Sequence, residues 1–153
     1  TLLFLHADTL LPKDYVAHVR TVLAARGTIA GAFRLSIEGA PPGLRLIAAL
    51  ANLRSRWLQL PYGDQAIFLR GATFRSVGGF ADLLILEDLE LMGRLRRQGR
   101  IRIADEVVRT SGRLWTKQGV LCTTLIHQLL ILAHCTGLPT KRLRLWRDPD
   151  AAP

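Results

Sequence analysis

The chain has 153 residues, and 49% of them are hydrophobic, which fits one domain with a substantial core and excludes an intrinsically disordered protein. It carries 21 Lys and Arg against 12 Asp and Glu, a formal net charge of +9. This balance allows nucleic acid, anionic lipid or phosphorylated small molecules as partners and does not choose between them. No apolar run reaches the roughly 18 residues of a membrane span, so we expect no transmembrane segment.

Two cysteines, Cys122 and Cys135, are too few for a disulfide framework and favour a reducing compartment. We therefore predict a cytoplasmic protein, and peripheral contact with the inner face of the membrane stays open. A zinc site would need both cysteines to converge with His127 and His134, but only the two histidines share one helical face. We expect the segment 119–138 to form a buried or interfacial helix instead.

Strands and helices alternate in the first half of the chain. The predicted elements are a buried parallel strand at 2–5, a helix at 11–27, a half-exposed strand at 33–38 and a helix at 44–57. Pro12 near the start and Gly27 at the end support the first helix. Strict alternation of apolar and polar residues from 33 to 38 is typical of a strand with one face in the core.

The second half continues the alternation. The predicted elements are a buried strand at 66–70, a short helix at 71–80 broken by glycines, a helix from about 88 to 99, one or two short strands within 101–111 and a helix at about 119–135. The basic, proline-terminated end predicts a domain that closes at 146 and a flexible tail at 147–153. This order predicts an α/β fold with a mixed, mostly parallel sheet flanked by helices.

Acidic residues gather at three junctions between the predicted elements. Asp8 comes directly after the first strand, Asp64 leads into the strand at 66–70, and Glu87 and Asp88 begin a helix. In open α/β sheets, ligands bind beyond the carboxyl ends of the strands. We therefore expect these four carboxylates to line one concave site.

The third acidic cluster has two readings. Acidic residues near a helix N-terminus are stabilised by the exposed N–H groups and the dipole there, and Glu90 pairs with Arg94 at ordinary helical spacing. Alternatively, a carboxylate held rigidly at a helix start takes a proton during catalysis. The two roles are compatible in Asp88. Because Asn caps helices about as well as Asp, Asp88→Asn is expected to cost about 1 kcal/mol or less.

Seven short segments carry a resemblance to a known family. They are LFLHADT, GAFRLS, NLRSRW, PYGDQAIFLR, FRSVGGF, LEDLEL and TSGRLW. Their order and spacing, between residues 2 and 146, resemble the family 2 glycosyltransferases, and most closely the bacterial transferase 2 subgroup associated with radical-SAM and selenium-related genes. The resemblance implies a GT-A, Rossmann-like fold. It also implies an inverting, hexosyltransferase-type enzyme that moves a sugar from a nucleotide-diphosphate sugar to an acceptor hydroxyl with Mn²⁺ or Mg²⁺.

The resemblance also implies roles for single residues. Asp8 matches the metal-binding aspartate, and Asp88, with Glu87 orienting it or the acceptor, matches the catalytic base. His6 departs from the acidic residue that opens the family's Asp-X-Asp signature, and would contact the nucleotide or the metal. The other candidate substrate-binding residues are Asp64, Gln65, Gly78, Gly79, Phe80, Arg113 and Trp115.

Each of these further candidates has a structural alternative. Asp64 and Gln65 would bond sugar hydroxyls, or Asp64 would brace a loop. The segment 78–80 would approach the acceptor, or form a plain turn. Arg113 would meet the diphosphate and Trp115 would stack on a sugar, or both would pack under the last helix.

In the family 2 glycosyltransferases that the chain resembles, an N-terminal βαβ region holds the base and ribose of the nucleotide. No segment of this sequence corresponds to that region. We therefore expect a chain that is truncated or completed by another chain, and that shows little or no sugar transfer alone. The expected partners are the nucleotide-sugar donor and a small-molecule or lipid-linked acceptor, without nucleic acid.

The alternative function is a basic, non-enzymatic module that binds nucleic acid or an anionic membrane surface. It rests on the net charge and on the arginines of segment 94–102 and the residues after 140. The two functions predict different structures. An enzyme should bring Asp8, Asp64 and Asp88 to one cleft, whereas a binding module would scatter them and gather the arginines on one face.

Overall fold

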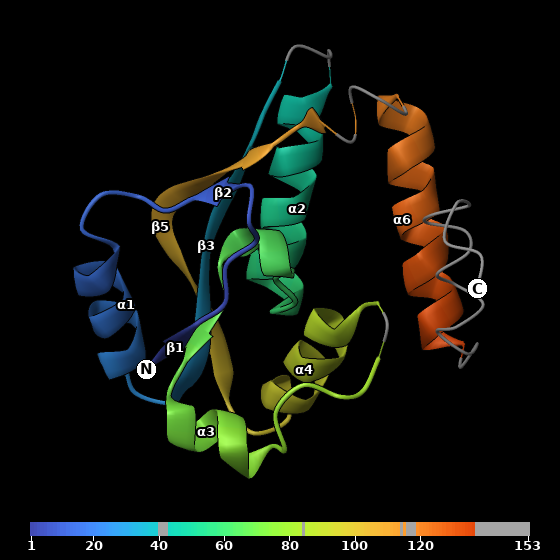
Figure 1. Cartoon of the computed structure of the whole chain (residues 1–153). Helices are drawn as coiled ribbons and strands as arrows, with labels where there is room; N and C mark the ends of the chain where they lie inside the picture. The colour runs from blue at the N-terminus through green and yellow to red at the C-terminus, as the bar shows by residue number, and fades with distance from the viewer. Residues whose placement is uncertain (40–42, 84, 114, 116–118, 137–153) are drawn as a thin grey trace.

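The computed structural model describes residues 1–39, 43–83, 85–113, 115 and 119–136. The predicted domain end at 146 and the tail at 147–153 lie outside these residues. The described part is a curled, five-stranded mixed sheet flanked by helices (Figure 1), which confirms the α/β class.

The strands are β1 (Leu2–Leu3), β2 (Thr9–Leu10), β3 (Thr28–Glu38), β4 (Phe68–Leu69) and β5 (Arg100–Ser111). The helices are α1 (Tyr15–Ala24), α2 (Leu44–Leu58), α3 (Gly71–Ser76), α4 (Glu87–Arg96) and α6 (Val120–Cys135), with a 3₁₀ turn η1 (Gly63–Gln65). Every predicted helix is present. One long strand, β5, replaces the one or two short strands expected after α4, and β2 was not predicted.

The strand order is β1-β4-β3-β5-β2. Only β3 and β5 pair in parallel, from Thr28 beside Arg100 to Glu38 beside Ser111, and the other three pairs are antiparallel. The prediction of a mostly parallel sheet is therefore wrong for the strand pairs. The strand at the start of the chain runs antiparallel to β4 and is only half-buried. A short apolar run indicates burial but carries no information on the direction of its neighbour.

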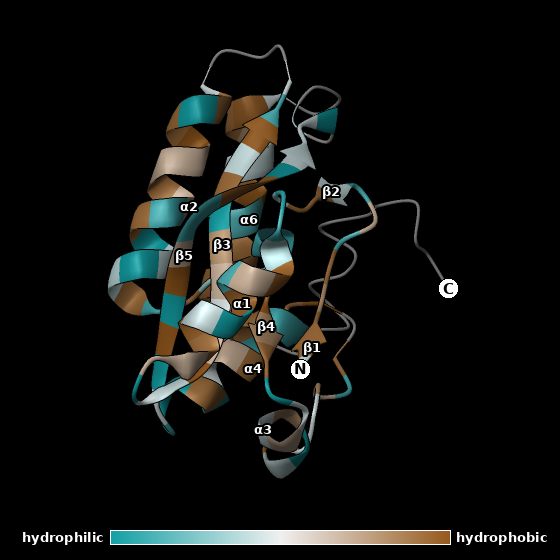
Figure 2. Cartoon of the chain, turned by 90° about the vertical axis from the view of Figure 1, so that its left-hand side faces the viewer, coloured by the Kyte–Doolittle hydropathy of each residue, from teal (hydrophilic) through white to brown (hydrophobic). Residues whose placement is uncertain are grey.

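The core lies on both faces of the sheet. On one face, Val19 of α1 belongs to the same buried cluster as Phe33 of β3. On the other face, Leu91 of α4 clusters with Ala32 of β3. The alternation predicted for residues 33–38 is confirmed, because the apolar positions are buried and the polar ones are not. In Figures 1 and 2, α1 and α6 lie on opposite sides of the sheet.

Two side-chain amides complete the edge of β3 beyond the point where β4 ends. Asn52 of α2 accepts a hydrogen bond from the Leu35 N–H at 2.7 Å and donates one to the Leu35 carbonyl at 2.9 Å. Gln65 of η1 donates to the Phe33 carbonyl at 3.0 Å. These amides satisfy backbone groups that a neighbouring strand would otherwise satisfy. They also fix α2 and η1 against the sheet, and η1 enters the candidate site.

None of the helices in the described part of the chain is long and apolar enough to cross a bilayer.

Candidate functional site

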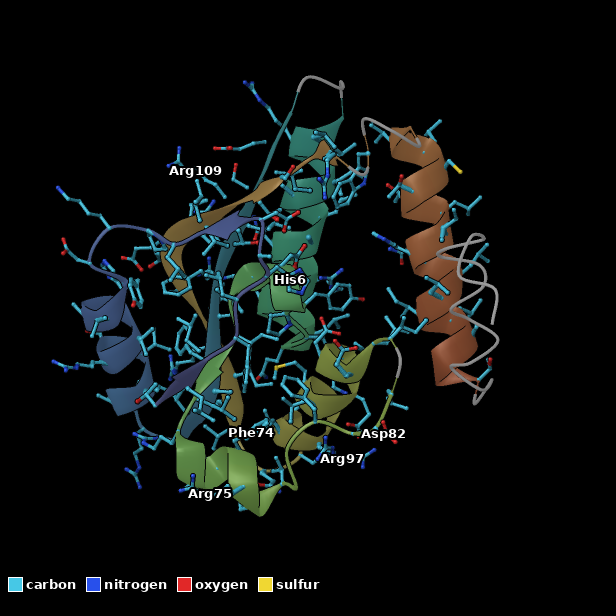
Figure 3. The ribbon with its side chains drawn as sticks, viewed as in Figure 1. His6, Phe74, Arg75, Asp82, Arg97 and Arg109 are labelled. Carbon is cyan, nitrogen blue, oxygen red and sulfur yellow. The ribbon has the colours of Figure 1, made fainter. Side chains whose placement is uncertain are left out.

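A cavity of about 720 Å³ lies where five segments meet: the turn after β1, η1, the start of α4, the end of β5 and one face of α6. Asp8, Asp64, Glu87 and Asp88 all line it. Their placement agrees with the expectation from the sequence, although their roles stay predictions. His6, another lining residue, lies beside η1 near the middle of the molecule (Figure 3).

The Asp88 carboxylate joins the start of α4 to η1. Its Oδ2 accepts a hydrogen bond from the Gly63 N–H at 2.6 Å, and its Oδ1 accepts one from the Leu89 N–H at 2.7 Å. The N-cap position itself is Leu86, which has a left-handed backbone (φ 62°) and no capping side chain. Asp88 thus satisfies a first-turn N–H, as the capping interpretation predicted. Each carboxylate oxygen has a second lone pair, so these bonds leave the group able to accept a proton.

Gly63 lets the side chains of His6 and Asp88 approach the same point of the backbone. A Cβ atom at this position would lie 2.5 Å from His6 Nε2 and 3.3 Å from Asp88 Oδ2. The imidazole of His6 therefore occupies the space that any other residue would fill. The sequence interpretation did not select Gly63, and its only signal there was a glycine directly before the candidate residue Asp64.

Asp64 is half-buried, and its Oδ1 atom is buried without a hydrogen-bond partner in the described part of the chain. Burial raises the pKa of this carboxyl to about 6; the nearby Arg54 guanidinium and His6 ring oppose the rise, and the Asp88 carboxylate adds to it. Arg54 stacks over the Tyr62 ring at 3.5 Å. A cavity carboxyl that titrates close to neutral pH suits proton transfer.

A short turn places Asp8 at the rim of the cavity. The Thr9 N–H donates to the His6 carbonyl at 3.1 Å, and the Thr9 hydroxyl donates to the buried Thr110 hydroxyl of β5 at 3.0 Å. The Asp8 carbonyl accepts a bond from the Ser111 N–H at 3.3 Å, while its side chain is exposed. The turn and the end of β5 therefore hold Asp8 in place through backbone and threonine contacts.

The cavity is acidic although the protein is basic. Among its described lining residues, Arg113 is the one Lys or Arg, against four carboxylates. Within the described residues, no three His, Cys, Asp or Glu side chains converge closely enough to hold a metal ion. These residues therefore do not form a metal site by themselves, and an ion at Asp8 would need ligands from a bound molecule.

Trp115 packs as the structural alternative predicted. It is 9% exposed, belongs to the core cluster that includes Leu44, and meets the ring of His127 edge-on at 5.8 Å. Trp115 also lines the cavity, so its role in stacking on a sugar stays a prediction beside this packing role. His127 lines the cavity as well; the sequence interpretation weighed it only as a zinc ligand and did not place it in this site.

Gln65 is wrongly assigned to sugar binding. The residue is fully buried, accepts a bond from the Ser55 hydroxyl at 2.6 Å and donates to the Phe33 carbonyl. Its oxygen also accepts from the Tyr62 N–H at 3.3 Å. The side-chain amide is thus used inside the protein and braces η1 behind the cavity.

Gly78, Gly79 and Phe80 do not line the cavity. Both glycines have positive φ (82° and 70°), as a plain turn requires, and Phe80 packs on Phe4 and Phe74 at 4.8 and 5.4 Å between ring centroids. Figure 3 shows Phe74, which belongs to α3, below His6. These contacts agree with the plain-turn interpretation, and an acceptor role for this segment stays a prediction.

Comparisons with protein-family models, curated proteins and solved structures found no match to this chain. The glycosyltransferase resemblance therefore rests on the seven sequence segments, and the chemistry of the site rests on its geometry.

Proposed function

We propose that the chain carries the acidic residues of an inverting glycosyltransferase site of the GT-A type. The observation that carries this proposal is that Asp8, Asp64, Glu87 and Asp88, from three separate motifs, line one cavity. A basic binding module has no need of this arrangement. The order of the seven segments supports the same function.

In the proposed reaction, the Asp88 carboxylate accepts the proton of the acceptor hydroxyl. The acceptor oxygen then forms a bond to the anomeric carbon while the bond from that carbon to the diphosphate oxygen breaks. Attack opposite the leaving group inverts the configuration. The two backbone bonds to Asp88 fix the direction of its carboxylate before the substrate binds.

Asp64 and Glu87 support this step. The Asp88 carboxylate contributes to the raised pKa of Asp64, so Asp64 is the carboxyl that holds a proton more readily. Glu87 begins α4 at the cavity wall and would orient the acceptor. Arg113 would contact the leaving diphosphate.

A donor diphosphate meets unfavourable charge in this cavity, because four carboxylates outnumber Arg113. We propose that Mn²⁺ or Mg²⁺ arrives with the donor and uses Asp8 as its protein ligand. Mg²⁺ is commonly bound by one or two carboxylates together with phosphate oxygens and water. Such an ion would supply positive charge beside the diphosphate.

The test measures donor binding, which is the first step of the proposed reaction. A panel of nucleotide-diphosphate sugars is titrated calorimetrically into the protein with and without Mn²⁺. We expect one nucleotide class to bind only with the metal, and binding to weaken at least about tenfold in Asp8→Ala. Glu90→Gln is the matched control, since it removes a carboxylate from α4 outside the cavity. Absence of binding by every donor, or equal binding by both variants, would contradict the proposal.

A further inference from the structure

Helix α2 is apolar on the face that it turns to solvent. Four side chains spaced by four, three and four residues lie on this face: Leu46, Leu50, Leu53 and Trp57, which are 62%, 52%, 54% and 77% exposed. This spacing puts them in one stripe along the helix. The opposite side of α2 is already buried in the core. The exposed stripe is therefore additional to the packing that holds the helix in the fold.

Basic side chains flank the stripe. Arg45 and Arg56 lie along one side of it and are exposed, and Arg54 lies along the other side. From α4, Arg96 reaches the last turn of α2 and donates to the Leu58 carbonyl at 2.9 Å. No residue of α2 is acidic. In Figure 2, α2 lies at the edge of the molecule with hydrophobic and hydrophilic bands alternating along it.

We propose that this outer face of α2 docks on the surface of an anionic phospholipid bilayer. A helix that lies in the membrane interface has an apolar stripe, a basic flank and an exposed aromatic residue, and α2 has all three. The 15 residues of α2 would extend about 22 Å along the surface. The leucines and Trp57 would enter the region between head groups and acyl chains, and the arginines would meet the lipid phosphates.

Charge argues against a second copy of the chain as the partner. Two α2 faces packed together would bring Arg45 and Arg56 of both copies close, without an acidic residue on either helix to offset them. Helix α6 also exposes leucines, among them Leu125 at 61%, but it carries no Lys or Arg. It therefore serves as an internal control for an apolar face without cations.

The experiment measures co-sedimentation of the whole chain with vesicles of phosphatidylcholine alone or mixed with phosphatidylglycerol. We expect partitioning at least about tenfold stronger on the anionic vesicles, and weaker in high salt. The double variant Leu50→Glu, Leu53→Glu should lose at least about tenfold, whereas Leu125→Glu should bind like the wild type. If the Glu variant does not fold by circular dichroism, the uncharged Leu50→Gln, Leu53→Gln variant replaces it.

A second pair of variants separates local from total charge. The control variant Arg20→Glu, Arg26→Glu changes the net charge by the same amount, at exposed positions in and just after α1. The variant Arg45→Glu, Arg56→Glu should weaken binding by at least about tenfold more than this control. Equal binding to neutral vesicles, no binding, or equal losses in the two pairs would overturn the proposal. Light scattering is the remaining check: a dimer that the Leu50 variant dissociates would assign this face to a second copy instead.

Discussion

The backbone N–H of Gly63 donates a hydrogen bond of 2.6 Å to Oδ2 of Asp88 and so ties η1 to the first turn of α4. The other oxygen of the same carboxylate accepts from the Leu89 N–H at 2.7 Å. Two backbone donors thus orient Asp88 without the help of another side chain. A substitution that removes either acceptor changes the local structure as well as the charge.

Asp88→Asn is expected to lower both stability and turnover. An amide has only one accepting oxygen, so either Gly63 or Leu89 would direct its N–H at an NH₂ group. We expect a loss of about 1–3 kcal/mol in the free energy of unfolding, more than the capping argument alone predicted. In an active form of the protein, turnover should fall by about 10²–10⁴-fold. Urea unfolding measures the first effect, and initial rates well below the melting temperature measure the second.

Glu90→Gln is the control for this variant. Glu90 forms an ion pair with Arg94 at 2.6 Å. Arg94 also donates hydrogen bonds to the carbonyls of Val77 and Gly79, so it holds the turn that precedes the acidic cluster. The variant should loosen that turn and leave the rate nearly unchanged. A rate loss equal to that of Asp88→Asn would mean that the base is placed on the wrong residue.

Gly63→Ala is expected to disturb the cavity through His6. The backbone at this position accepts alanine, but the new Cβ would lie 2.5 Å from His6 Nε2, so the imidazole must move. We expect a loss of about 1 kcal/mol or less in stability, because an exposed imidazole moves aside more easily than a side chain packed in a core. In a His6→Ala background the same change should cost clearly less, because the clashing ring is gone. Thermal melting of the two single variants and the double variant gives this coupling, and strictly additive effects would contradict the contact.

Asp64→Asn is expected to stabilise the protein at pH 8 and to have little effect near pH 4. The folded pKa of Asp64, about 6, lies above the ordinary value of 3.8, so the folded state binds the proton more tightly than the unfolded state. Stability is therefore lost as the pH rises from about 4 through 6, and above this window the ionised carboxylate destabilises the fold. One pKa unit corresponds to about 1.4 kcal/mol, so Asp64→Asn should raise the free energy of unfolding at pH 8 by at most about 3 kcal/mol. The gain is smaller for a half-buried group. Melting temperatures across this pH range measure the difference, and a difference independent of pH would contradict the raised pKa.

Metal binding should depend on diphosphate. Because no cluster of three ligand side chains forms in the described part of the chain, Mn²⁺ alone should bind weakly. Addition of a nucleoside diphosphate should strengthen binding by at least about tenfold, since the phosphate oxygens complete the coordination. Asp8→Ala should remove this gain. Calorimetric titration with and without the nucleotide is the measurement, and tight binding of Mn²⁺ without it would count against the assignment of Asp8.

The sequence by itself predicted the helices, the alternation of β3 and the approximate positions of the acidic residues. These features depend on neighbours two to four positions away, which the sequence shows directly. It also predicted that Asp8, Asp64 and Asp88 would meet, because each stands at the end of an element. The side-chain pair of Glu90 and Arg94 followed from the same local spacing.

Only the tertiary structure decided the rest, because the deciding neighbours are distant in the chain. The antiparallel pairing of β1 with β4 depends on how the connections fold back, and an apolar run does not encode direction. Gln65 is a core residue because its amide meets the open edge of β3 rather than the cavity. Gly63 matters because His6, 57 positions before it, fills the space beside its Cα. Burial among such distant segments also raises the pKa of Asp64, which its sequence context alone does not show.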